Sequence, residues 1–191
     1  MKIGVLSDTH AHSIEDIPQK VVDFLVDVDL TVHAGDFTAR EVLDGLRKLG
    51  KLKAVQGNMD SVAIKSELPI KEVIEVGGKR IGITHGSGGP WGIEQRVRKM
   101  FGQVDVIVYG HSHQSENRVI DGILFFNPGR ASESFGLLVV GQQPSGVVLH
   151  FFICQQTLNL SGHPGSAIIN GYSGSRVIGQ PPRSGIVDKW C

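Results

Sequence analysis

The sequence predicts one α/β domain over residues 1–152, because short β-branched runs alternate with segments of helical periodicity and several runs end in His, Asp or Asn. A chain of 191 residues is long enough to bury a core of two or four layers. Five apolar runs have the length and the flanking residues of buried strands. They are Ile3 to Leu6, Leu30 to His33, Leu52 to Val55, Arg80 to Thr84 and Val104 to Tyr109.

Three helices are expected between these strands. Ser13 can cap the first, because apolar residues from Ile14 to Val28 keep a near-helical spacing. A second helix is expected from about Ala39 to Leu49, closed by Gly50, and a third from about Gly92 to Phe101. This alternation predicts an α/β core.

The second half of the domain is expected to contain more antiparallel strand. Gly77-Gly78 and Asp121-Gly122 each separate two apolar runs, as hairpin turns with positive φ require. Gly136 to Val140 and Val147 to Phe152 are expected to be the last strands.

Residues 153–191 differ from the domain before them. Periodicity disappears from Ile153 onward, Gly, Ser and Pro are frequent, and few charged residues remain. We therefore treat this segment as an atypical C-terminal tail, and we hypothesise that it is out-of-frame sequence or was added during cloning. An intact-mass comparison with the natural gene product tests that hypothesis.

The charge balance and the length of the apolar segments argue against nucleic-acid and membrane partners. Lys and Arg together number 19, as do Asp and Glu, so no overall positive field favours extended nucleic-acid binding. Residues 2–7 are too short for a signal-peptide core, and no stretch approaches transmembrane length. We expect a cytoplasmic protein without a membrane partner.

Five short polar segments follow predicted strands and contain most of the candidate chemistry. In order they are Asp8-Thr9-His10, Gly35-Asp36, Gly57-Asn58-Met59-Asp60, Thr84-His85-Gly86 and Gly110-His111-Ser112-His113. Carboxyl ends of strands converge on one edge of an α/β fold, so these segments are expected to meet. Alternation along an extended segment would point Asp8 and His10 to the same side, and likewise His111 and His113. Imidazole, carboxylate and amide donors without thiolate suit Mn, Zn, Fe, Co or Ni.

In this order, the segments resemble the signature D-x-H, G-D, G-N-x-[DE], H and G-H-x-H of the calcineurin-like metallophosphoesterase superfamily. The short length and the Asn127-Pro128-Gly129 turn resemble its small bacterial and archaeal phosphodiesterase branch. The resemblance covers about residues 1–150. It implies a four-layer α/β/β/α fold, in which a β-sandwich is flanked by helices.

The resemblance also implies a site for two divalent metal ions, with Mn expected first and Ni, Zn, Fe or Co as alternatives. Asp36 would bridge the two ions. One ion would be held by Asp8, His10 and His113, and the other by Asn58, His85 and His111.

A phosphodiesterase acting on a small phosphate ester is the implied function, with a metal-bridging hydroxide attacking phosphorus in line. Asp36, Asn58 and His85 are the expected catalytic residues. Two alternatives stay open: a metal-binding scaffold for protein interactions, as in a eukaryotic relative with this fold, and a phosphomonoesterase or nuclease. The physiological substrate and homo-oligomerisation are also open.

Two departures from the family pattern concern catalysis and substrate. Met59 stands where many members have a His that assists the leaving group, so esters with acidic leaving groups, such as aryl diesters, should be preferred. Arg130 stands where the similar branch more often has Ser. We consider Arg130 and His12 candidate substrate contacts.

The remaining candidates are supporting residues. Asp60 and His33 are expected to hold the ligand loops from behind. A basic patch of Arg96, Arg98 and Lys99 is expected to be a solvated face, and Trp91 a packing residue.

Overall fold

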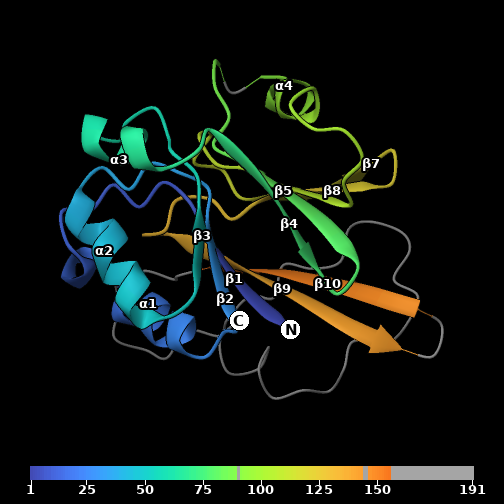
Figure 1. The fold of residues 1–191 in the computed structure, drawn as a ribbon, viewed down its shortest axis with the longest axis horizontal. Helices are drawn as coiled ribbons and strands as arrows, with labels where there is room; N and C mark the ends of the chain where they lie inside the picture. The colour runs from blue at the N-terminus through green and yellow to red at the C-terminus, as the bar shows by residue number, and fades with distance from the viewer. Residues whose placement is uncertain (90, 144–145, 156–191) are drawn as a thin grey trace, which may run out of the picture.

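Two five-stranded sheets form the core of the computed structural model, which describes residues 1–89, 91–143 and 146–155 (Figure 1). The first sheet has the order β10 (Gly146–Gln155), β9 (Ser134–Gln143), β1 (Lys2–Leu6), β2 (Leu30–His33) and β3 (Leu52–Ala54). The second has the order β4 (Lys71–Val76), β5 (Lys79–Thr84), β6 (Val106–Val108), β8 (Ile123–Asn127) and β7 (Glu116–Ile120). Each contains a parallel group, β1-β2-β3 in the first and β5-β6-β8 in the second.

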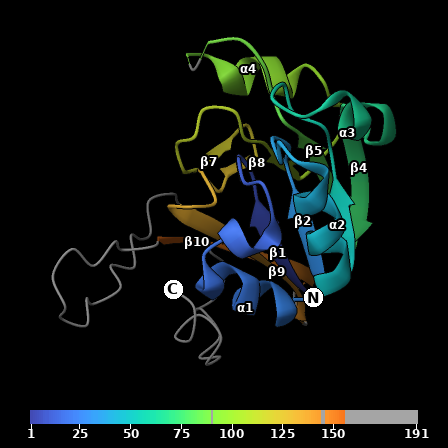
Figure 2. The same cartoon turned by 90° about the vertical axis from the view of Figure 1, so that its left-hand side faces the viewer.

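Successive side chains along a strand point to opposite faces of the sheet, so each sheet contributes to two apolar layers. Val106 and Val108 of β6 pack in the core between the sheets, whereas Ile107 packs on the outer face with residues of α4 (Ile93–Arg98). In the first sheet Val5 faces the inner core, and Leu6 faces α1 (Gln19–Val26) and α2 (Arg40–Leu49). Figure 2 shows α1 and α4 at opposite ends of this stack. The predicted four-layer α/β/β/α fold is confirmed.

The first predicted helix is divided in two. Ile14–Asp16 form a 3-10 helix (η1), and α1 begins only at Gln19. Pro18 disfavours helical backbone at the residue before it, and Ile17 accordingly has an extended ψ of 133°. The expectation of one continuous helix to Val28 was therefore wrong.

Other elements also differ from expectation at their edges. A short helix that was not predicted, α3 (Val62–Glu67), begins after Ser61, whose side chain accepts the Ile64 N–H. The helix α4 ends three residues before the expected Phe101. Both predicted hairpin turns are present, with φ of 55° and 77° at Gly77 and Gly78, and 50° and 78° at Asp121 and Gly122.

The last described strand, β10, continues to Gln155, so residues 153–155 belong to the first sheet. The rest of the tail prediction, over residues 156–191, lies outside the described residues. Among the described helices, none has the length and apolar character needed to cross a membrane.

Candidate metal centre

The seven candidate ligands lie at the edge where the parallel strands of both sheets end. Asp8 and His10 follow β1, Asp36 follows β2, Asn58 follows β3, His85 follows β5, and His111 and His113 follow β6. Backbone hydrogen bonds connect neighbouring loops: the N–H groups of Asp8 and His10 donate to the carbonyls of Gly35 (3.0 Å) and Asp36 (3.2 Å). The structure thus brings together residues from five loops.

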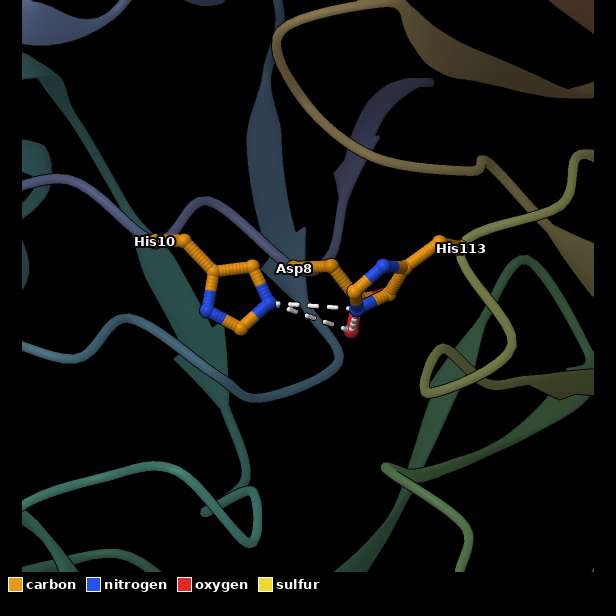
Figure 3. A group of neighbouring side chains, drawn as sticks. All are labelled: Asp8, His10 and His113. Atoms are coloured by element: carbon orange, nitrogen blue, oxygen red, sulfur yellow. Dashed lines mark hydrogen bonds and ion pairs between the residues drawn. The ribbon is translucent and has the colours of Figure 1, made fainter. Parts of the chain in front are cut away.

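The first group of side chains consists of Asp8, His10 and His113 and is called the Asp–His cluster below. Figure 3 shows the three polar ends turned toward one another. His113 Nε2 lies 3.4 Å from Asp8 Oδ1 and 3.2 Å from His10 Nε2, while His10 Nε2 lies 4.0 Å from Asp8 Oδ1. Such separations suit atoms that each bind one ion at about 2.0–2.2 Å.

The second group, called the Asn–His cluster, consists of Asn58, His85 and His111. Asn58 Oδ1 lies 3.0 Å from His85 Nε2 and 2.8 Å from His111 Nδ1. The carboxylate of Asp36 connects the two clusters, because its Oδ2 lies 3.2 Å from His85 Nε2 and 3.8 Å from His10 Nε2. That is the location that a bridging carboxylate needs. Asp8 Oδ1 is more distant from His85 Nε2, at 4.0 Å.

Backbone carbonyls orient both imidazoles of the Asn–His cluster. His85 Nδ1 lies 2.8 Å from the Ala34 carbonyl, and His111 Nε2 lies 2.7 Å from the Gly88 carbonyl. A carbonyl only accepts, so each of these nitrogens carries the proton. In neutral imidazoles the other nitrogen then directs a lone pair toward Asn58 Oδ1. Three electron-pair donors facing one point fit a cation, and they match nitrogen- and oxygen-binding divalent metals.

Five of the candidate ligands have left-handed backbone conformations. The φ angles of Asp8, His10, Asp36, His111 and His113 are 52°, 47°, 61°, 70° and 58°. Among the described non-glycine residues, only Thr38 and Asp121 share this property. Such conformations are uncommon and cost on the order of 1–3 kcal/mol each, and they concentrate at functional sites. The extended alternation expected for Asp8 and His10, and for His111 and His113, was therefore the wrong reason for their convergence.

Glycines before two ligands allow close approach to a carboxylate. A Cβ on Gly57 would lie 2.1 Å from Asp36 Oδ1, and a Cβ on Gly110 would lie 2.8 Å from Asp8 Oδ2. Neither distance is sterically possible, so any side chain at these positions would displace the adjacent carboxylate or the loop.

Asp60 and His33 lie behind the ligand loops. The buried Asp60 carboxylate accepts the N–H groups of Asp36 (3.2 Å), Gly57 (2.7 Å) and Thr38 (2.9 Å). His33 Nδ1 accepts the Gly35 N–H at 3.1 Å, and its Nε2 lies 2.6 Å from Thr9 Oγ1. Burial, followed by the charge of His85, lowers the pKa of His33 to about 3, so this imidazole stays neutral.

Asp36 and His85 shift each other's pKa in opposite directions. Burial acts to raise the pKa of Asp36, but the hydrogen bond and charge of His85, together with the Met59 N–H and the charge of His10, outweigh it and lower that pKa. Conversely, burial acts to lower the pKa of His85, and the hydrogen bond and charge of Asp36, together with the charge of Asp8 and the Ala34 carbonyl, outweigh it and raise that pKa. A divalent ion bound between these groups would need the Asp36 carboxylate ionised and the His85 imidazole neutral.

The substrate candidates occupy different surroundings. Arg130 has a buried Nε without a hydrogen-bond partner among the described residues, and its charge contributes to lowering the pKa of His10, for which burial is the largest cause. His12 is exposed, and its backbone N–H donates to Asp16. Met59 is 58% exposed, while its N–H donates to Asp36 Oδ1 at 2.7 Å.

Two supporting residues were missed in the sequence. Thr38 Oγ1 lies 3.4 Å from His10 Nδ1. The buried Asn127 side chain donates to the Gly110 carbonyl and to Ser112 Oγ, both at 3.0 Å, so it holds the turn that carries His111 and His113. Asn127 is the last residue of β8, which pairs in parallel with β6, so it lies at the same sheet edge as the ligands that follow β6. A polar residue at the end of an apolar strand could have pointed to it in the sequence.

Near α4, the expectation for Trp91 was wrong, and the expected solvated face holds for two of its three residues. Trp91 is 90% exposed and does not pack in the core. Arg98 and Lys99 are exposed, whereas Arg96 is half-buried and its guanidinium donates to three backbone carbonyls of the preceding loop.

The fold and site together define the metallophosphoesterase class of protein. The calcineurin-like phosphoesterase superfamily domain matches residues 1–151, and the chain belongs to this family. A probable metallophosphoesterase from Methanocaldococcus jannaschii is 40% identical over 133 residues, covering 68% of this chain and 67% of its own length. A phosphodiesterase from the same organism is 31% identical over 146 residues, covering 68% and 83%.

A solved structure gives the same result for the fold. Vps29 complexed with Zn²⁺ from Entamoeba histolytica superposes with a TM-score of 0.67 at 26% identity, covering 85% of this chain and 95% of Vps29. The resemblance inferred from the sequence motifs is thereby confirmed at the level of family and fold.

Proposed function

We propose that this phosphoesterase is a phosphodiesterase with two divalent metal ions. The observation that carries the proposal is the location of Asp36 Oδ2, which lies within 3.8 Å of His10 Nε2 and 3.2 Å of His85 Nε2. A single carboxylate oxygen between two sets of nitrogen and oxygen donors is the arrangement expected of a bridged pair of ions. The similarity to an archaeal phosphodiesterase supports the bond type.

The donor set assigns residues to each ion. The Asp–His cluster would hold one ion and the Asn–His cluster the other, with Asp36 shared between them. Manganese is proposed first, with Ni, Zn, Fe and Co as alternatives, and imidazole nitrogen and hard oxygen without thiolate suit this group of metals. When bound, such ions supply Lewis acidity, an activated water and charge for an anionic phosphorus centre.

This chain's own residues would orient the substrate. Arg130 is proposed to bind a non-bridging phosphate oxygen, because its positive charge contributes to lowering the pKa of His10 and its Nε has no hydrogen-bond partner among the described residues. Met59 supplies no proton to a leaving group. We therefore propose aryl diesters as better substrates than alkyl esters or monoesters.

The experiment compares a chromogenic aryl diester with the matching monoester. Protein stripped by a chelator is reloaded with Mn²⁺, Zn²⁺, Ni²⁺, Co²⁺ or Fe²⁺, and bound metal and turnover are measured on the same samples. We expect about two equivalents of metal, no turnover in the stripped protein, and faster hydrolysis of the diester.

Three results would reject this function. Faster hydrolysis of the monoester, or cleavage of single-stranded DNA in preference to the diester, would indicate a phosphomonoesterase or a nuclease. A fully metal-loaded protein without turnover of any ester would favour a protein-interaction scaffold.

A further inference from the structure

Arg96 fastens the loop between β5 and α4 to the helix that follows it. Its Nε donates to the Ser87 carbonyl and its Nη1 to the Trp91 carbonyl, each at 2.8 Å, and its Nη2 donates to the Gly89 carbonyl. The planar guanidinium has donors in a fixed fork, so three carbonyls bound at once must keep a set arrangement. Two of them, those of Ser87 and Gly89, flank Gly88 in sequence.

Gly88 connects this loop to the metal centre. It has a φ of 82°, and its carbonyl accepts from His111 Nε2 at 2.7 Å. A Cβ on Gly88 would lie 3.3 Å from Arg96 Nε, so the guanidinium packs closely against the residue whose carbonyl it helps to orient. The chain of contacts therefore runs from Arg96 through Gly88 to His111.

Loss of the Gly88 acceptor would permit a competing hydrogen bond. A neutral His111 can place its proton on either nitrogen, and Nδ1 lies only 2.8 Å from Asn58 Oδ1. With the proton on Nδ1, His111 would donate to Asn58. That bond would occupy two of the three donors of the Asn–His cluster at once.

We propose that Arg96 is a positioning residue for the Asn–His cluster: by fixing the Gly88 carbonyl it keeps the His111 proton on Nε2 and leaves Nδ1 and Asn58 Oδ1 free for a cation. This inference rests on the proposed function for its use of metal. Its consequence for the His111 tautomer holds in the metal-free protein.

The chain offers matched controls. Arg98 lies on the same helix and also donates to backbone carbonyls, those of Phe101 (2.7 Å) and Gly102 (3.3 Å), which are outside the β5–α4 loop. Trp91→Ala removes an exposed ring but keeps the carbonyl that Arg96 binds. Arg98→Ala and Trp91→Ala should therefore leave the His111 tautomer unchanged.

The first measurement is the imidazole ¹⁵N spectrum of metal-free protein, with the His111 signals assigned by their loss in His111→Asn. In the unaltered chain we expect the Nε2–H form. In Arg96→Ala the Nδ1–H form should appear, and Arg96→Lys, with one cationic group in place of the fork, should be intermediate. If Arg96→Ala does not fold, the proportion of the Nδ1–H form in Arg96→Lys tests the inference.

The second measurement is a metal titration followed by calorimetry. Arg96→Ala should weaken one binding step by about 10- to 100-fold, as loss of a hydrogen bond behind a metal-ligating His typically does, and leave the other step unchanged. An unchanged tautomer in the Arg96 variants would overturn the inference, as would equal weakening of both steps. Failure of the unaltered chain to bind metal would instead reject the proposed function.

Discussion

The carboxylate of Asp60 accepts the backbone N–H of Asp36 at 3.2 Å, and thereby determines the backbone conformation of the residue that connects the two ligand clusters. Asp60 Oδ2 also accepts the Gly57 N–H at 2.7 Å, immediately before Asn58. One buried carboxylate thus joins the loops after β2 and β3. Because a carboxylate only accepts, it suits a site where three N–H groups converge.

Asp60→Asn should test this role. An amide offers one accepting oxygen and an NH₂ that would face an N–H group, so at least one buried donor loses its partner. We expect a loss of about 1–3 kcal/mol in the free energy of unfolding and about 10- to 100-fold weaker metal binding. Urea unfolding and metal titration measure the two effects. Asp121→Asn, in an exposed turn, is the control, and identical behaviour of the two variants would argue against the role.

The two ligand carboxylates should respond differently to removal. Asp36→Ala should reduce occupancy of both metal positions and abolish turnover, because its Oδ2 lies near both His10 and His85. Asp8→Ala should mainly empty the position of the Asp–His cluster, because Asp8 Oδ1 lies 3.4 Å from His113 Nε2, whereas at His85 Nε2 it is more distant (4.0 Å) than Asp36 Oδ2 (3.2 Å). Metal analysis of dialysed protein gives both occupancies. Equal losses in the two variants would contradict the assignment of Asp36 as the bridge.

The order of ligands could be predicted from the sequence because each one follows a strand of a parallel group. Asp8, Asp36 and Asn58 end consecutive parallel strands, so fold class alone places them at one edge. What directs the side chains could not be predicted. The left-handed φ of His10 and the Gly88 carbonyl that holds His111 depend on loop conformation, which residue type barely constrains at a non-glycine position.

The misplaced elements have equally local causes. Apolar spacing suggested one helix across Pro18, but the conformational restriction at Ile17 outweighed the periodicity. The helix α3 has only six residues and buries only Ile64, so it lacks the amphipathic pattern by which a helix is recognised.

The pH dependence of stability should reveal His33. Its pKa is about 3 in the folded protein and about 6.5 when unfolded, so the unfolded state binds the extra proton between these values. The stabilisation from neutral His33 is complete above pH 6.5 and is lost as pH falls toward 3, by up to about 1.4 kcal/mol per pH unit. His33→Asn, whose amide oxygen can still accept the Gly35 N–H, should reduce this slope. Unfolding of metal-free protein from pH 7 to pH 4.5 tests it, and equal slopes would exclude His33 as the source.

Arg130 should contribute to the capture of the phosphate anion. If its forked donors bind a non-bridging oxygen, Arg130→Ala should lower kcat/KM by about 10- to 100-fold, and Arg130→Lys by less because one charged donor remains. Metal content should not change, since Arg130 is not a ligand. Steady-state kinetics with the aryl diester gives the answer. If kcat/KM is unchanged in Arg130→Ala, Arg130 has no role in substrate binding.

Met59 lies beside the metal centre without contributing an acidic proton. Its backbone N–H donates to Asp36 Oδ1, and its side chain is 58% exposed, so a substitution can change the side chain while retaining that backbone contact. Met59→His should therefore add a proton donor without altering the ligands. Met59→Gln, similar in size but without a group that titrates near neutral pH, is the matched control.

The gain from Met59→His should depend on the leaving group. A poor leaving group needs protonation as its bond to phosphorus breaks, whereas an acidic phenol departs as an anion. Monoesters and alkyl esters should therefore be accelerated more than aryl diesters, with the effect growing as leaving-group pKa rises. General acid assistance is typically worth about 10²- to 10⁴-fold, and a new imidazole without supporting contacts should recover only part of it. Rates for a series of leaving groups, measured at equal metal content, test this. A uniform change across the series, or the same profile in Met59→Gln, would show that the new imidazole does not act as an acid.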